Sequence, residues 1–117
     1  MSLCIACVLI APQVAFSLDG TGYKDIGEAG QILYIGGVLD GWHHMYELSK
    51  FKFKQEGLAP SPVEKVVVHI ENCIDDRHMQ FEQIKAIIDK YRDDHPNQWH
   101  YRMSWMALKS LQDACNE

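Results

Sequence analysis

The chain has 117 residues, a formal net charge of −5 at pH 7, 47% hydrophobic residues and four cysteines. This length fits a single domain and excludes a large enzyme with its own cofactor domain. The acidic balance argues against a dedicated nucleic-acid binder, which would need a basic face. The hydrophobic fraction is ample for a packed core.

The first 17 residues are typical of a secretory signal peptide. They carry no charged side chain, and the apolar run 3–11 has the length of a signal-peptide core. Ala15 and Ser17 put small residues at the −3 and −1 positions of a cleavage site. We therefore expect cleavage after Ser17, which leaves one domain over residues 18–117 that is not embedded in a membrane. The alternative is that the segment forms a buried helix or strand of the mature fold.

Cleavage would leave two cysteines, Cys73 and Cys115, in the mature chain. An even pair in an exported protein suggests one disulfide, although two buried free thiols are the alternative. Cys4 and Cys7 have the spacing of a redox or metal pair, but no second such pair follows them. We interpret these two thiols as incidental to the discarded segment.

The first elements of the mature chain are a lead-in and a long helix. Residues 18–25 form a short polar lead-in with a turn signal. Over residues 26–50, apolar residues recur at steps of three and four, as on one face of an α-helix; they are Ile32, Ile35, Leu39, Trp42 and Tyr46. Residues 51–60 form the connection to the next helix, with Gly57 and Pro60 as breakers.

Three glycines, Gly30, Gly37 and Gly41, share one face of the expected long helix. Glycine costs about 1 kcal/mol relative to alanine in a helix interior, so a shared glycine face calls for an explanation. A smooth face would let another helix approach closely. This face therefore serves either for packing within the chain or as a seam with a second copy or another protein.

The next helix has a clear beginning and an ambiguous interior. Ser61 to Glu64 fits a capping box with Pro62 at the first helical position. Val63, Val66, Val67 and Ile70 follow at helical spacing. The β-branched run from Val66 to Val68 also suits a strand, so both helix and strand stay open here.

Two amphipathic helices complete the chain. Residues 80–92 carry the first apolar stripe, and His95-Pro96 ends that helix. Residues 97–114 carry two stripes: Trp99, Met103, Met106, Ala107 and Leu111 on one side, and Tyr101, Trp105 and Leu108 on another. A helix that is apolar on two sides lies either at the centre of a bundle or against a partner. The sequence predicts an all-α fold, a small bundle of about four helices with one disulfide.

We find no pattern of residues that indicates catalysis or metal binding. The six histidines include no pair at helical ligand spacing, and the adjacent His43 and His44 diverge by about 100° on a helix. No Gly-x-Ser-x-Gly pattern occurs, and the carboxylates of Asp75-Asp76 and Asp93-Asp94 diverge as sequence neighbours do. We therefore expect a protein that is not an enzyme, with no metal and no cofactor, that acts by binding, inhibition or chaperoning.

The residues Tyr34-Ile35-Gly36-Gly37-Val38-Leu39-Asp40-Gly41 resemble the Gly-Val-x-Asp-Gly helix of the Rap/Tai immunity proteins. The order of later elements is similar to the second half of that family: Cys73, Gln80-x3-Ile84, Ile87-Ile88-Asp89-Lys90-Tyr91, His95-Pro96, Trp99-His100, Ala107-Leu108 and Cys115. The resemblance covers about residues 27–115. Two features depart from the family: a further cysteine near the first helix is missing, and residues 51–70 are longer, with a more basic start.

The resemblance implies an exported helical protein of the Gram-negative periplasm. Its implied function is to bind and block a cognate peptidoglycan amidase effector that type VI secretion delivers, and homodimers are also expected. It further implies that Cys73 and Cys115 carry the family disulfide. A protruding loop near residues 51–61 or 75–79 would plug the amidase cleft. The alternative function is a small periplasmic acid-stress chaperone with a single disulfide.

Overall fold

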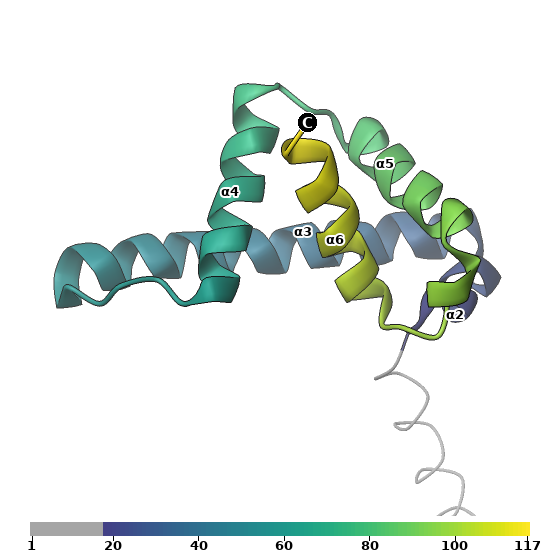
Figure 1. Ribbon diagram of the computed structural model, residues 1–117, viewed down its shortest axis with the longest axis horizontal. Coiled ribbons are helices and arrows are strands. Elements are labelled where there is room, and N and C mark those ends of the chain that lie inside the picture. Colours follow the sequence, from purple (N-terminus) through teal and green to yellow (C-terminus); the bar gives the residue numbers. More distant parts are fainter. Residues whose placement is uncertain (1–17) are drawn as a thin grey trace, which may run out of the picture.

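The chain folds into helices that form a small bundle with one projecting end (Figure 1). The computed structural model describes residues 18–117, so the predicted signal peptide lies outside the described residues. The helices are α2 (Gly20–Asp25), α3 (Gly27–Phe51), α4 (Pro62–Asp76), α5 (Phe81–Asp94) and α6 (Met103–Cys115), with a π-helical turn η2 (Lys52–Glu56) and a 3₁₀ turn η3 (Pro96–Gln98). Within residues 18–117 no strand forms beyond one isolated backbone bridge. The predicted all-α bundle is confirmed.

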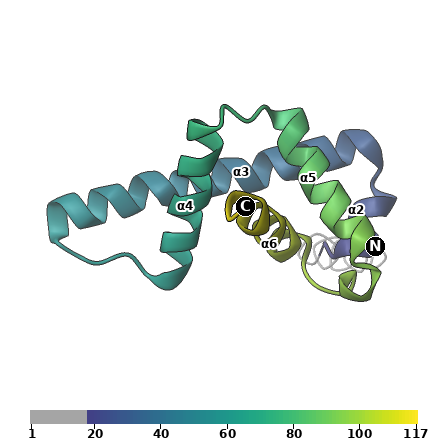
Figure 2. The same cartoon turned by 45° about the horizontal axis from the view of Figure 1, so that its top comes forward.

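Helix α3 forms the back of the molecule. In both ribbon views α4, α5 and α6 lie on one side of it (Figures 1 and 2). Its 25 residues make a rod about 37 Å long, and the described chain measures 56 × 38 × 24 Å. The C-terminal part of α3 runs past α4 and leaves the bundle, so one end of the rod has no helix packed around it.

Helix α6 supplies the centre of the core. Its fully buried residues belong to the stripe that the spacing predicted: Met103, Met106, Ala107 and Leu111. They pack against buried residues of the other four helices, namely Tyr23, Ile35, Ile70, Ile84 and Ile88. Burying an aliphatic side chain of this size stabilises a fold by about 1.5–3 kcal/mol. The core therefore depends on α6 more than on any other helix.

The ambiguous segment after Ser61 is the helix α4. The Ser61 hydroxyl accepts a hydrogen bond from the backbone nitrogen of Glu64 at 3.2 Å, and Pro62 is the first helical residue, as predicted. Val67, Ile70 and Cys73 are buried on one side of the helix. Their spacing of three matches a helix and not a strand, because a strand would need buried residues two apart. Packing against α6 thus outweighs the β-branched run.

The lead-in is a helix where we expected a turn. Asp19 caps α2 by accepting a hydrogen bond from the backbone nitrogen of Gly22 at 2.8 Å. Tyr23 is buried in the core, and this burial stabilises a six-residue helix that its two glycines would disfavour in isolation. The prediction of a polar lead-in was wrong because it ignored this tertiary anchor.

The bounds of two other segments also differ from the prediction. The chain stays helical through η2, and it turns only at Gly57, whose φ of +67° suits glycine. The last helix begins at Met103, not at residue 97. The Met103 backbone nitrogen donates to the Leu18 carbonyl at 2.9 Å, so the preceding residues run beside the lead-in instead of continuing a helix.

One disulfide, Cys73–Cys115, joins α4 to the end of α6. This is the predicted pair, and its formation is confirmed. Arg77 strengthens the same junction by donating to the carbonyls of Ala114 at 3.0 Å and Glu117 at 3.1 Å. The C-terminal end of α6 is thus held covalently and by charge-assisted hydrogen bonds.

Candidate protein-binding surface

The projecting end of the molecule, which we call the arm, consists of α3 from Met45 onward, η2 and the return loop to Ser61. The last buried residue of α3 is Ser49. Beyond it the chain is exposed until the start of α4, except at Pro60, which is half-buried. The arm is nevertheless built from continuous helix and a capped helix start, so it presents a defined surface.

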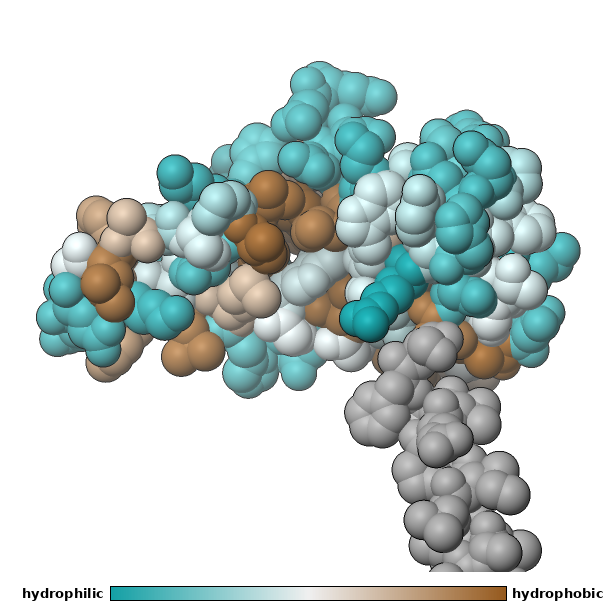
Figure 3. Space-filling model, turned by 60° about the horizontal axis from the view of Figure 1, so that its bottom comes forward, coloured by the Kyte–Doolittle hydropathy of each residue, from teal (hydrophilic) through white to brown (hydrophobic). Residues whose placement is uncertain are grey.

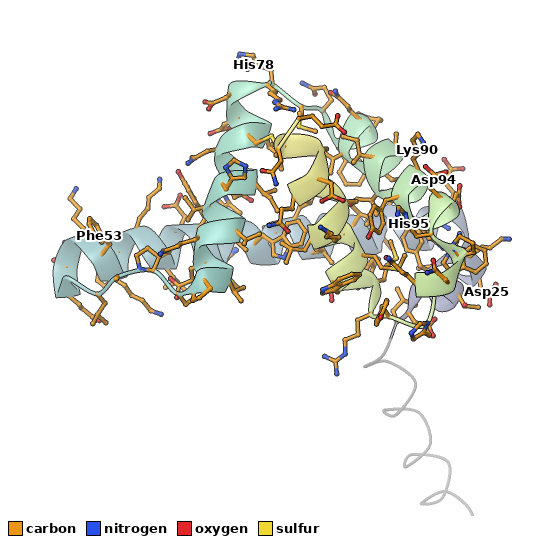
Figure 4. All side chains as sticks on the ribbon, in the orientation of Figure 1. Asp25, Phe53, His78, Lys90, Asp94 and His95 are labelled. Atoms are coloured by element: carbon orange, nitrogen blue, oxygen red, sulfur yellow. A yellow bond between two sulfur atoms is a disulfide. The ribbon has the colours of Figure 1, made fainter. Side chains whose placement is uncertain are left out.

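The arm exposes large hydrophobic side chains. Leu48, Phe51, Phe53, Leu58 and Val63 at the adjoining start of α4 are each more than half accessible. Figure 3 shows hydrophobic residues at this end of the molecule, interspersed with hydrophilic ones. Phe53 lies near the free end of the arm, far from Lys90, Asp94 and His95 at the opposite end (Figure 4). Single exposed hydrophobic residues are common, but their concentration on one projection makes the arm a candidate interaction surface.

A groove of about 280 Å³ opens where the arm meets α4. The residues that line it are Met45, Leu48, Ser49, Lys52, Ser61, Val63 and Glu64. Its walls are mostly apolar, and its polar contribution includes Lys52 and Glu64, whose charged groups lie 3.8 Å apart. We call it the arm groove. An apolar floor with one ion pair at its edge has the composition of a protein-docking site.

The acidic group of the arm groove is held in its charged form. A hydrogen bond from Ser49, followed by those from Ser61 and the charge of Lys52, keeps the pKa of Glu64 below its ordinary value. On the same arm, the pKa of Lys50 is raised by its contacts with Tyr46 and Glu47. The Glu64 carboxylate in the arm groove is therefore charged at neutral pH.

A second group of polar residues joins α2, α3 and α5. Tyr23 donates to Asp89 at 2.6 Å, and Lys85 donates to the same carboxylate at 2.7 Å and to Gln31 at 3.2 Å. Burial, then the hydrogen bond to Asp89, raises the pKa of Tyr23, so its hydroxyl stays a donor. These contacts tie three helices together, and we interpret the group as structural.

Arg92 fastens the same end of the bundle. It is buried, its Nε donates to the Gly20 carbonyl at 2.6 Å, and its guanidinium lies 4.1 Å over the Trp99 ring. Trp99 in turn donates to the Arg92 carbonyl at 2.7 Å. The Nη2 atom of Arg92 is buried without a partner among the described residues. The spacing of apolar residues over 97–114 predicted that Trp99 is a core residue of the last helix. In the structure Trp99 is half-buried and lies before the start of α6.

Of the glycines expected at a packing or dimer seam, only Gly30 is packed within the described chain, where its Cβ would meet Ile26 at 3.1 Å. A Cβ built on Gly37 or Gly41 would meet no described atom within 4 Å. Trp105 therefore does not lie against either glycine; its exposed ring lies 5.1 Å from that of Tyr101. Helix α6 lies at the centre of the bundle, which is one of the two alternatives that its two apolar stripes left open. The second stripe is nevertheless exposed at Tyr101 and Trp105. A seam with a second copy or another protein stays a prediction.

The histidines form separate contacts. His43 lies 3.4 Å from Glu71, His69 lies 3.1 Å from Asn116, and His95 stacks on Tyr91. Over residues 18–117 no three His, Cys, Asp or Glu side chains gather in a way that could hold a metal ion.

Of the two protruding loops that the sequence suggests, residues 51–61 do form the outer part of the arm. The other, residues 75–79, comprises the end of α4 and most of the short connection to α5. The contribution of Met45, Leu48 and Val63 to the arm groove was missed. The available signal was that Leu48 lies off the buried stripe of α3.

No family model, no curated protein and no solved structure matches this chain. None of the helices in residues 18–117 combines the length and the apolar character needed to cross a membrane. The features that bear on function are therefore the arm and the sequence resemblance.

Proposed function

We propose that the protein is a stoichiometric inhibitor that binds another protein through the arm groove. The observation that carries this proposal is the concentration of Leu48, Phe51, Phe53 and Leu58 on a projecting arm, with Val63 beside it at the start of α4. Large apolar side chains gathered on the surface beside a pocket are a feature of protein-interaction sites. A projecting shape would let them enter a concave surface.

The construction of the arm favours tight binding. Helical structure continues through η2, and the Ser61 cap and Pro62 define the start of α4. A surface that is ordered before binding loses less conformational entropy when it docks. Blocking a cleft needs such a preorganised surface and no chemistry of its own, which agrees with the expectation that the protein is not an enzyme.

The resemblance to the Rap/Tai immunity proteins suggests the partner. On that basis the protein is a periplasmic immunity protein, and its partner is a cognate peptidoglycan amidase that type VI secretion delivers. The Cys73–Cys115 disulfide supports an exported protein, because disulfides persist in oxidising compartments such as the bacterial periplasm. The predicted signal peptide agrees with this location.

The test is co-expression with an amidase encoded beside this gene. We expect a stoichiometric complex on co-purification and loss of peptidoglycan hydrolysis. Val63→Glu should weaken binding about tenfold or more, because it places a charge in the apolar docking surface. Ile32→Glu is the matched control: Ile32 is also a partly exposed aliphatic residue, but it lies outside the arm. Absence of a complex, or equal loss of binding in both variants, would contradict the proposal.

The acid-stress chaperone remains a second candidate because of one observation. His43, His44, His69, His78 and His100 are all exposed, and histidines ordinarily gain charge between about pH 8 and pH 5. Acidification would therefore add positive charge to a surface that already exposes the apolar arm. A client that aggregates at low pH distinguishes the two functions: unchanged aggregation in the presence of the protein rejects the chaperone.

A further inference from the structure

Two hollows lie in line along one side of α3, away from the arm. The first, of about 340 Å³, opens between α3 at Glu28 and Ile32 and the first half of α5. The second, of about 320 Å³, opens between α3 from Gly36 to His43 and the helices α4 and α5. Phe81 lines both hollows, so they adjoin and form one groove, which we call the side groove. It shares no lining residue with the arm groove.

The side groove is long and its lining is largely apolar. Its α3 wall follows positions three and four residues apart from Glu28 to His43, which lie on one side of a helix. At 1.5 Å per residue this wall is about 22 Å long, or about four helical turns. The apolar lining includes four side chains that the core leaves partly exposed: Ile32, Leu39, Ile74 and Phe81.

Gly36 keeps the side groove open near the middle of its α3 wall. A Cβ built on Gly36 would meet no described atom within 4 Å, so a side chain there would stand in the groove and not against the bundle. Glycine is also a poor helix former, at about 1 kcal/mol relative to alanine. The bare backbone at this position lets a docked segment approach α3 closely.

The rim of the side groove is acidic. Five carboxylates line it against a single lysine, Lys85; they belong to Glu28, Asp40, Glu71, Glu82 and Asp89. Lys85 is already engaged, because its Nζ donates to Asp89 at 2.7 Å and to Gln31 at 3.2 Å. Glu28, Asp40 and Glu82 are exposed. A complementary ligand therefore combines apolar side chains with positive charge.

The walls of the side groove favour a helical ligand over an extended one. They are built from α3, α4 and α5, whose backbone groups are paired within each helix and offer no strand edge. An extended segment would lose water from its backbone amides and carbonyls without gaining partners, whereas a helix pairs these groups internally.

We propose that the side groove binds a basic amphipathic helix of another protein. The apolar side of that helix lies on Ile32, Leu39 and Phe81, and its lysines or arginines face the acidic rim. An anionic lipid surface is the wrong partner, because the rim carboxylates repel it. The proposal goes beyond the inhibitor function and does not rest on it, since the side groove and the arm groove are separate surfaces.

The test follows the fluorescence anisotropy of a labelled peptide of leucine and lysine, whose leucines recur at steps of three and four, as the full-length protein is added. We expect saturable binding that weakens as the salt concentration rises. Glu82→Lys should raise the dissociation constant about fivefold or more, because it replaces an attraction at the rim by a repulsion. Glu56→Lys is the matched control: it makes the same change in net charge, but Glu56 is exposed on the arm and off the side groove. It should leave the dissociation constant nearly unchanged.

Gly36→Leu and Gly37→Leu form a second matched pair, which tests the shape of the side groove. A Cβ meets no described atom within 4 Å at either position, but only Gly36 lines the groove. Gly36→Leu should abolish saturable binding by filling the middle of the groove, whereas Gly37→Leu should bind the peptide as the wild type does. Circular dichroism should show that both variants keep their helices, because leucine favours a helix more than glycine does.

Three results would overturn the proposal. The first is absence of saturable binding by the wild type. The second is equal weakening by Glu82→Lys and Glu56→Lys, since the peptide would then respond to net charge alone. The third is equally tight binding of a leucine–glutamate peptide. Sedimentation velocity of the protein alone tests a different occupant: self-association that Glu82→Lys abolishes would assign the groove to the basic arm of a second copy and would also overturn the proposal.

Discussion

The disulfide between α4 and α6 makes a quantitative prediction about stability. Its cysteines are 42 residues apart in sequence, and both are buried. The chain-entropy relation gives about 4 kcal/mol for a loop of this length, because the bond restricts the unfolded chain. We expect Cys73→Ala with Cys115→Ala to lower the free energy of unfolding by about this amount. For a domain of this size, the unfolding midpoint would fall by roughly 20 °C.

Urea denaturation under non-reducing conditions measures the change in unfolding free energy directly. Wild-type protein treated with a reductant should move to the same midpoint as the double variant, which separates loss of the bond from loss of the sulfur atoms. Arg77 still donates to the carbonyls of Ala114 and Glu117, so the variant should keep its helical content. A loss below about 1 kcal/mol, with full helicity in both proteins, would refute the entropic reasoning.

Three further predictions concern helix ends and glycines. Ser61→Ala should lower the free energy of unfolding by about 1 kcal/mol in urea denaturation, because it removes the cap of α4. Gly36→Ala should raise it by about 0.5–1 kcal/mol, since a Cβ there meets no described atom within 4 Å, whereas Gly27→Ala should lower it because φ is +77°; thermal unfolding of the pair checks both signs. Glu64→Gln should make the decrease in melting temperature on acidification smaller than in the wild type. The pKa of Glu64 lies below its ordinary value in the folded protein, so its stabilisation is present above the unfolded pKa and disappears as pH falls through the folded pKa. Parallel curves of melting temperature against pH for wild type and variant would contradict this.

Helix positions were largely predictable because their signals are local. The Ser61–Pro62 start of α4, the break at His95-Pro96 and the apolar spacing of α5 each depend on neighbours a few residues away. The exception at the N-terminus is instructive. The glycines of residues 18–25 predicted a turn, but burial of Tyr23 and capping by Asp19 stabilise the helix α2 there.

The candidate site was predictable only in outline. The connection after α3 was recognised as a protruding segment, but the arm groove joins Leu48 to Val63 across a reversal of the chain. The periodicity within one helix does not show which of its residues will lie beside residues of another helix. The same limit applies to α6, where two apolar stripes were visible and only one of them is buried.

The sequence by itself predicted that this protein is all-α, where most helices begin, which residues of α6 form the core and which two cysteines form the disulfide. Only the tertiary structure decided that α3 outruns the bundle, that Gly37 and Gly41 have no neighbour within the described chain, and that Leu33, Phe51 and Trp105 face outward. The physical reason is that helical periodicity establishes which residues share a face, whereas burial depends on which faces meet. That second property belongs to the packing of distant segments and not to any one of them.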